Sequence, residues 1–211
     1  SPFIIGGKKI LIDKFGAVNL PKSSEPELMK GLSWLAFAFP EGEKEKYYTF
    51  EPKRFLSFYF EKEQFLSSNI WKYISLSIVK MKSLCDKNGI KMIVVYAPTA
   101  ANVILPAIAE KVPPDEFHDF MRLKAREIPP KSEIYADFLA KSNVIETVLA
   151  DFSKEQKFEF IDLKSSLREK MEKGDQCYFT YDQHWSPDGH KLVSEIISKK
   201  IKEMENPDPS R

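Results

Sequence analysis

The chain has 211 residues, of which 43% are apolar and 30% are charged, and its formal net charge is +1. These values are ordinary for a globular protein that is long enough to bury a core. A net charge so close to zero gives no general attraction to nucleic acid or to an anionic membrane, so we expect no nucleic-acid partner. The longest apolar runs are too short to cross a bilayer, which predicts no transmembrane segment in this chain.

The N-terminal quarter of the chain is predicted to hold one regular feature. The segment FIIGGKKILID has the pattern of two short strands joined by a Gly-Gly turn. Residues 15–50 contain scattered prolines and a run of aromatic residues, and we expect them to be irregular. Residues 53–66 are compatible with a helix.

A helix and a buried strand are predicted next. In SSNIWKYISLSIVKMKSLCDKNG the apolar residues recur at helical spacing, a serine or asparagine can cap the front, and Gly89 can end the helix. Cys85 falls on the apolar face, which predicts a buried thiol. The run IKMIVVYAP is rich in β-branched residues and is typical of a strand buried on both faces of a parallel sheet. Pro98 and Thr99 then open a loop at its carboxyl end.

The C-terminal half alternates helices with one more strand. Helical patterns cover roughly 114–127 and 138–152, and KFEFIDL is predicted to be a strand. KSSLREKMEKG is a short helix that Gly174 can close, and QCYFTY suits a brief extended piece. In the last helix Ser186 is a suitable N-cap and Pro187 fits the first position.

Strands that alternate with helices predict an α/β fold, specifically a three-layer α/β/α sandwich with a mostly parallel sheet. We expect a single domain over 1–211. It would consist of an irregular N-terminal segment with the hairpin (1–52), an α/β core (53–205) and a tail (206–211). Sites in such sheets lie at the carboxyl ends of the strands.

The stretch YDQHWSPDGH holds the strongest candidate site. Asp182 and His184 are two residues apart, so in an extended segment both side chains project to the same side. The carboxylate can then orient the imidazole, which leaves one ring nitrogen to accept a proton from a nucleophile. A D-x-H pair alone is a weak signal. Two other interpretations stay open: a helix start without catalysis, and a metal site that also uses Asp188 and His190.

Three stretches resemble the SGNH/GDSL-type hydrolase family. DQHWSPDGHKLVSEII is similar to the Asp/His block of the branch in which a tryptophan follows the histidine. NGIKMIVVYAPTAANVILP resembles the central strand of that branch, and KFEFIDLKSSL its strand and Asp-Leu corner. The similarity covers roughly residues 71–201. Alginate O-acetyltransferase-like proteins share the D-x-H-W block.

The resemblance implies an SGNH-like ester hydrolase, or an O-acetyl esterase or transferase, that acts on an acylated carbohydrate or lipid. His184 would be the general base and Asp182 its orienting acid, with no metal and no organic cofactor. An extracytoplasmic location, periplasmic or at the cell envelope, also follows from the resemblance. Gly189 would allow close approach at the helix start. Three residues are expected to contact the ester substrate: Thr99, Tyr181 and Trp185.

The nucleophile of the family, a serine in a Gly-Asp-Ser block, is not found in the sequence. Ser165 and Ser166 lie between a strand and a helix but lack the flanking glycines of a nucleophile elbow, so we expect them to cap the helix. Either the serine lies outside this chain, or it is lost and the protein is a non-catalytic binding or scaffolding module. We favour the first explanation. A sheet without its first strands would expose an edge and pair with a missing segment or with a second copy.

Overall fold

The computed structural model describes most of the chain. The described residues are 3–5, 8–10, 35–39, 46–50, 52–55, 57–123, 127–180 and 184–206. The chain divides into two compact units, one formed by Ser1–Phe50 with Ser165–Arg211 and the other by Glu51–Lys164. This division does not test the predicted single domain over 1–211, which stays a prediction.

The first unit contains two antiparallel strand pairs. β1 (Phe3–Ile5) pairs with β2 (Lys8–Ile10), which confirms the two strands of the predicted hairpin. β3 (Leu35–Phe39) pairs with β4 (Lys46–Phe50). The prediction that residues 15–50 are irregular is wrong for these two strands. Both are short and rich in aromatic residues, and aromatic side chains favour strands through cross-strand packing that a single-sequence pattern does not reveal.

The C-terminal part of the first unit is helical. α9 (Lys164–Glu172) starts at the boundary between the units, and Gly174 follows it at φ 94°, a conformation that glycine adopts without strain. α10 (Pro187–Glu205) is the last helix described. Between them Tyr178 forms an isolated antiparallel bridge with Trp185, which confirms the predicted extended piece.

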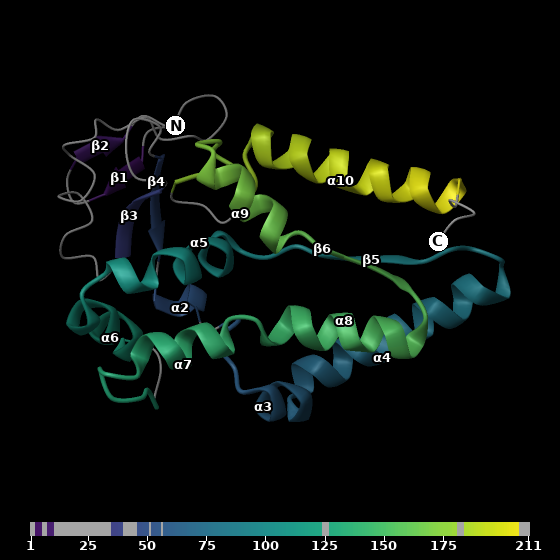
Figure 1. The fold of residues 1–211 in the computed structure, drawn as a ribbon, viewed down its shortest axis with the longest axis horizontal. Helices are drawn as coiled ribbons and strands as arrows, with labels where there is room; N and C mark the ends of the chain where they lie inside the picture. Colours follow the sequence, from purple (N-terminus) through teal and green to yellow (C-terminus); the bar gives the residue numbers. More distant parts are fainter. Residues whose placement is uncertain are drawn as a thin grey trace. The chain divides into compact units, whose positions relative to one another are not determined.

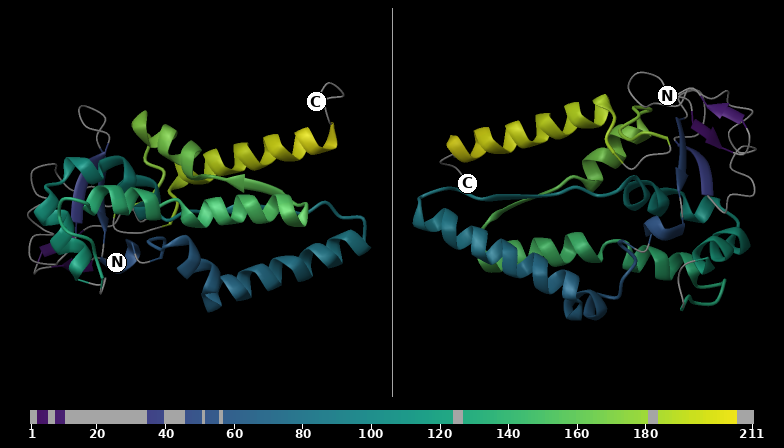
Figure 2. Two further views of the ribbon diagram at one scale, coloured as in Figure 1. Left: turned by 60° about the horizontal axis from the view of Figure 1, so that its bottom comes forward. Right: turned by 180° about the vertical axis from the view of Figure 1, so that it is seen from behind.

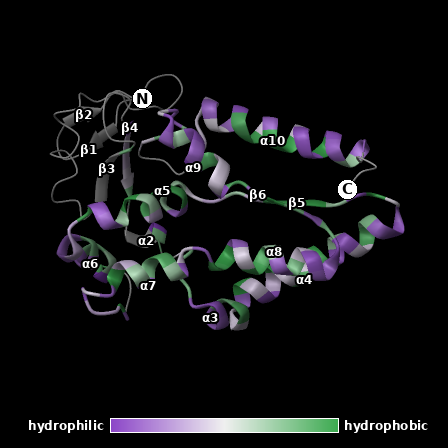
Figure 3. Ribbon diagram, viewed as in Figure 1, coloured by the Kyte–Doolittle hydropathy of each residue, from purple (hydrophilic) through white to green (hydrophobic). Residues whose placement is uncertain are grey.

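The second unit is built on a parallel pair of strands. β5 (Ile93–Tyr96) pairs with β6 (Glu159–Asp162), with Ile93 opposite Glu159 and Tyr96 opposite Asp162. β5 is coloured as mostly hydrophobic in Figure 3, as expected for a strand inside an α/β fold. Both predicted strands are therefore confirmed, and both end at the same edge of the sheet.

Two helices cover one face of this strand pair. α4 (Asn69–Lys87) and α8 (Val144–Gln156) lie on the same side of β5 and β6 within the second unit (Figures 1 and 2). The core between them contains alternate residues of the strands together with apolar residues of the helices: Trp71, Ile78, Met92, Val94, Tyr96, Ile145, Leu149, Phe152, Phe158 and Phe160. The side chain of Ser68 caps α4 by accepting from the Trp71 amide, as predicted. Cys85, by contrast, is only half-buried.

Shorter helices complete the second unit. The predicted helix over 53–66 is two helices, α2 (Pro52–Phe55) and α3 (Lys62–Ser67), separated by a non-helical segment. α6 (Pro114–Arg122) confirms the first of the later helical patterns. The pattern over 138–152 is interrupted, because α7 (Ile134–Lys141) ends before α8 begins. A short 3-10 turn, η1, covers Ala109–Lys111.

α5 (Ala100–Ile108) follows β5 directly and was not predicted from the sequence. Seven of its nine residues are buried. A helix that is apolar on all sides shows no amphipathic period, and Pro106 within it is also a signal against a helix. The predicted loop at Pro98 and Thr99 is therefore only a short connection, which ends where Thr99 caps α5.

The described residues thus form an α/β fold with a small parallel sheet, which confirms the predicted fold class. The parallel sheet has two strands among these residues, and the other two strand pairs are antiparallel. Within the same ranges, no helix combines the length and the hydropathy that a membrane crossing requires.

Candidate functional site

The start of α10 is a built helix N-terminus. Ser186 is the N-cap, and its Oγ accepts a hydrogen bond from the Gly189 amide at 3.2 Å. The same hydroxyl donates to the Gln176 carbonyl. Pro187 occupies the first helical position, where a missing N–H costs nothing. The predicted cap and first turn are therefore confirmed.

The chain before α10 folds back on itself, and backbone hydrogen bonds close the base of this turn. The Ser186 amide donates to the Cys177 carbonyl at 2.9 Å, and the Phe179 amide donates to the His184 carbonyl at 3.3 Å. His184 therefore lies at the closed base of the turn, and its side chain is exposed. Asp182 and Tyr181, the orienting acid and one substrate contact of the sequence analysis, lie outside the described residues.

Gly189 is required at this site by close approach rather than by its backbone angles. A Cβ atom at this position would lie 2.2 Å from the Cys177 carbonyl oxygen and 3.0 Å from the Trp185 Cβ. The contact with the Cys177 carbonyl oxygen is to backbone and is too short for any larger residue, and the contact with Trp185 is tight. The expected close approach at Gly189 is present, and it holds the first turn of α10 against residue 177.

Trp185 connects the turn to the helix. Its ring meets the imidazole of His190 edge-on, with 5.5 Å between the ring centroids and an interplanar angle of 90°. A side-chain hydrogen bond also joins Trp185 to Tyr178, opposite it in the bridge. His190, a residue of the alternative metal hypothesis, thus has an aromatic neighbour. The role of Trp185 in substrate binding stays a prediction.

Cys177 and Tyr178, which precede the turn, are buried and uncharged at neutral pH. Burial raises the pKa of the Cys177 thiol to about 12, and the carboxylates of Asp175 and Asp188 act in the same direction. Burial also raises the pKa of Tyr178, against the hydrogen bond from Trp185. A thiol with so high a pKa supplies almost no thiolate at neutral pH, so Cys177 is not a nucleophile there.

In the second unit, Thr99 lies where the parallel strands end. Its hydroxyl accepts from the Asn102 amide at 3.3 Å, so Thr99 caps α5. The side chain is half-buried. Thr99 and His184 belong to different units, and each is described within its own unit. The predicted contact of Thr99 with substrate stays untested.

A buried charged cluster, which the sequence analysis missed, lies at the same edge of the parallel strands. Lys164 is the first residue of α9, and its side chain is 5% exposed. Its ammonium group donates to the Glu146 carboxylate at 2.5 Å, to the Asn143 side chain at 2.7 Å and to the Ser142 carbonyl at 2.7 Å. We name this set, with Asn102, the Lys164 cluster.

The Lys164 cluster joins three elements. The Ser142 carbonyl accepts from the side chains of both Asn102 in α5 and Lys164 after β6. Ser142 is the residue at which α7 ends, so the cluster lies at the break in the predicted helix. The second oxygen of Glu146 is buried without a hydrogen-bond partner among the described residues. The sequence contains one indication of this cluster. Lys164 is in the first turn of a helix, where a positive charge is unfavourable because of the helix dipole, so a buried anionic partner is a reason for its presence there.

Ser165 and Ser166 lie inside the first turn of α9, so the prediction that they cap this helix is wrong. The connection from β6 is made instead by Asp162, whose carboxylate accepts from the Lys164 amide at 2.9 Å. This is the two-residue side-chain turn that aspartate favours. The Asp-Leu corner at the end of β6 therefore has a structural role, because the Asp162 carboxylate forms the turn into α9.

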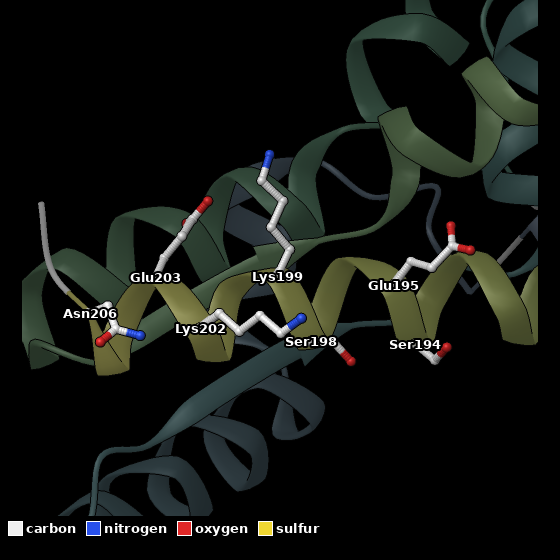
Figure 4. Close-up of a pocket in the computed structure, with 7 residues that line it drawn as sticks. All are labelled: Ser194, Glu195, Ser198, Lys199, Lys202, Glu203 and Asn206. Carbon is white, nitrogen blue, oxygen red and sulfur yellow. The ribbon is translucent and has the colours of Figure 1, made fainter.

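The surface hollow along α10 does not mark a further site. It has a volume of about 650 Å³, and its lining side chains all project from that helix (Figure 4). They are polar or charged: Ser194, Glu195, Ser198, Lys199, Lys202, Glu203 and Asn206. A row of this kind is the solvated face of an amphipathic helix. No group of three or more histidine, cysteine, aspartate or glutamate side chains in the described ranges is arranged to hold a metal ion.

A parallel strand pair and a closed turn before the last helix define an α/β protein with candidate site residues in the loops after its strands. Residues 75–210 match the family described as "SGNH hydrolase-like domain, acetyltransferase AlgX". The match covers more than half of the chain, and the chain belongs to this family. Comparison with curated proteins found no match, and neither did comparison with solved structures.

The family match confirms the resemblance on which the sequence analysis relied. It places the chain in an acetyltransferase- or esterase-like family. The matched range includes the D-x-H-W block, β5, β6 and the Lys164 cluster. It also includes all of α10, whose N-terminus forms the closed turn.

Proposed function

We propose that this domain takes part in the transfer or hydrolysis of an ester-linked acyl group, most simply an O-acetyl group on a carbohydrate or lipid. His184 is the general base, and Asp182 orients its imidazole. The observation that supports this proposal is the position of His184. It is an exposed histidine at the closed base of a turn, within a block that the acetyltransferase family matches.

The proposed reaction follows the logic of a serine triad. His184 accepts the proton of a serine hydroxyl while the serine oxygen bonds to the acyl carbon. His184 then gives this proton to the departing alcohol oxygen, which leaves an acyl-serine. In the second half His184 deprotonates a water molecule or a second alcohol, whose oxygen bonds to the acyl carbon. The bond between the acyl carbon and the serine oxygen breaks, and His184 returns the proton to that oxygen. We expect the serine to lie outside these 211 residues.

The fixed backbone around His184 is relevant to this chemistry. A general base has to be held within hydrogen-bond reach of the proton that it accepts. The hydrogen bond from the Phe179 amide fixes the peptide of His184, and Ser186 anchors the next turn. A base that is built on such a closed turn loses little conformational entropy when substrate binds.

The alternative function is a non-catalytic module of the same fold that binds a glycan or a partner protein. The observation in its favour is that the sequence contains no Gly-Asp-Ser block. Fold alone does not establish activity. The two functions are separated by whether a reactive serine exists in the natural protein.

The test uses the natural protein that carries this sequence, with p-nitrophenyl acetate as substrate and a fluorophosphonate as serine probe. His184→Ala should lower kcat by about 10²–10⁴-fold, the usual contribution of a general base. His190→Ala is the matched control, because it removes an imidazole from the first turns of α10 and should leave kcat nearly unchanged. Equal effects of the two substitutions would refute the role of His184. No turnover and no labelling in the natural protein would favour the binding module.

A further inference from the structure

Exposed large apolar side chains are concentrated on and beside α4. Of eleven such side chains among the described residues, nine lie between Leu66 and Ile90. Tyr73 is 69% exposed and Leu84 is 61% exposed. Scattered exposed apolar residues are normal, but a concentration on one element marks an interaction surface. The exposed side of α4 is therefore a candidate for docking.

Most of these residues of α4 lie in one stripe along the helix. Successive residues of an α-helix are rotated by about 100° around the axis. Five exposed apolar residues of α4 then fall within one arc of about 100°. We name them the α4 stripe: Ile70, Tyr73, Ile74, Met81 and Leu84. Ile78, which packs in the core with α8 and the strands, lies beside this arc and outside it.

The charges of α4 are distributed unequally around the stripe. The helix contains four lysines and one aspartate, which gives it a net charge of +3. By the same geometry Lys80 and Lys87 lie on one flank of the stripe, within about 40° of Tyr73, and Lys72 lies farther around the helix. Asp86 is on the opposite side of the helix, where it pairs with Lys82 at 2.6 Å. The exposed surface is therefore apolar and basic.

We propose that the α4 stripe docks on an anionic lipid surface. A helix with an apolar face and flanking lysines lies in the plane of a membrane interface, with its apolar side chains below the headgroups. Lysine side chains extend their apolar stems along such a surface and place the ammonium groups at the phosphates. Tyr73 has the amphipathic character that the headgroup region favours.

Charge and shape disfavour the other occupants of this surface. A second copy packed antiparallel about a two-fold axis would place the lysine flank of one α4 against that of the other. An amphipathic peptide helix requires a groove. The hollow of about 310 Å³ beside α4 is lined by Trp71 and Ser75, which face away from the stripe. A basic convex helix fits an anionic lipid surface better than it fits either partner.

Vesicle flotation tests the proposal. The natural protein should float with vesicles of equimolar phosphatidylglycerol and phosphatidylcholine. It should not float with vesicles of phosphatidylcholine alone, and its binding to the anionic vesicles should weaken as the salt concentration is raised. Tyr73→Ser combined with Leu84→Ser should abolish flotation. Leu123→Ser combined with Ile201→Ser is the matched control, since it removes two exposed apolar side chains outside the stripe. The control should float as the unmodified protein does.

Replacing lysines tests the electrostatic part. Each lysine near an anionic surface contributes about a five-fold factor in affinity, so Lys80→Gln and Lys87→Gln together should weaken binding by about 25-fold. No flotation of the unmodified protein, or equal flotation of the stripe variant and its control, would overturn the proposal. So would a protein dimer in solution that Tyr73→Ser and Leu84→Ser convert to monomer, because the occupant would then be a second copy.

Discussion

The start of α10 and the Lys164 cluster both follow strands or extended segments, but they are stabilised by different means. At α10 the contacts are made by backbone amides and carbonyls, by one capping hydroxyl and by a glycine that allows residue 177 to approach. In the Lys164 cluster an ammonium group and a carboxylate are buried together. Backbone contacts tolerate changes of side-chain charge, whereas a buried ion pair depends on both partners.

Removing Lys164 should have the largest effect. Lys164→Ala leaves the Glu146 carboxylate buried without its cation, and the free energy of unfolding should fall by about 3–5 kcal/mol. Chemical denaturation measures this change. Lys173→Ala is the matched control, because Lys173 and Glu169 form an exposed pair, and it should leave the midpoint unchanged.

A double substitution sharpens the same contrast. Lys164→Met with Glu146→Leu removes both charges and keeps the volume, so it should be less destabilising than Lys164→Ala. If the double variant were the less stable of the two, the uncompensated charge of Glu146 would not be the cause of the loss in Lys164→Ala.

Gly189→Ala should have the next largest effect. The new methyl group would collide with the Cys177 carbonyl oxygen, and the backbone would have to move apart. Overpacking of this kind costs about 1–3 kcal/mol of unfolding free energy. Thermal or denaturant unfolding measures it. An unchanged stability would mean that the turn and α10 are not held together at this point.

Ser186→Ala should be milder, because only the cap and its bond to Gln176 are lost. The loss of an N-cap hydroxyl costs about 1 kcal/mol. Ser194→Ala is the control, since this exposed serine lies in the middle of the same helix. Equal effects of the two substitutions would contradict the capping role of Ser186.

The smallest effect on the unfolding free energy at neutral pH is expected from replacing Cys177, whose thiol titrates only at alkaline pH. The pKa of Cys177 is raised from its ordinary value of 9.0 to about 12, so the folded state retains a proton that the unfolded state loses. Stability that this thiol contributes is complete below pH 9 and is lost as the pH rises toward 12. Cys177→Ala should reduce the alkaline loss of stability, measured as unfolding free energy against pH. Burial raises the pKa of Tyr48 and Tyr178 too, so part of the loss should remain.

Sequence patterns predicted the elements that carry a clear local signal. The amphipathic period of α4, the β-branched run of β5 and the Ser-Pro start of α10 all correspond to elements in the structure. Each is specified by residues within one element. The closed turn was predicted only as a helix start, because the bonds between Cys177 and Ser186 depend on backbone geometry.

Elements that depend on distant contacts were missed. α5 is buried on nearly all sides, and its apolar residues have no period from which a helix could be predicted. The break between α7 and α8 lies at Ser142, whose carbonyl is held by side chains 40 and 22 residues away. The Lys164 ion pair spans 18 residues of sequence and leaves no motif. These features arise from tertiary contacts rather than from local propensity.

The aromatic contacts give each unit its own optical reporter. The Trp71 indole packs edge-on against Phe152 at 5.1 Å within the second unit, and Trp185 packs against His190 in the first. Indole emission depends on the polarity and on the charges around the ring. In variants that retain one tryptophan each, fluorescence should therefore follow the two units separately during unfolding. Coincident transitions would indicate one cooperative domain, as the sequence analysis predicts.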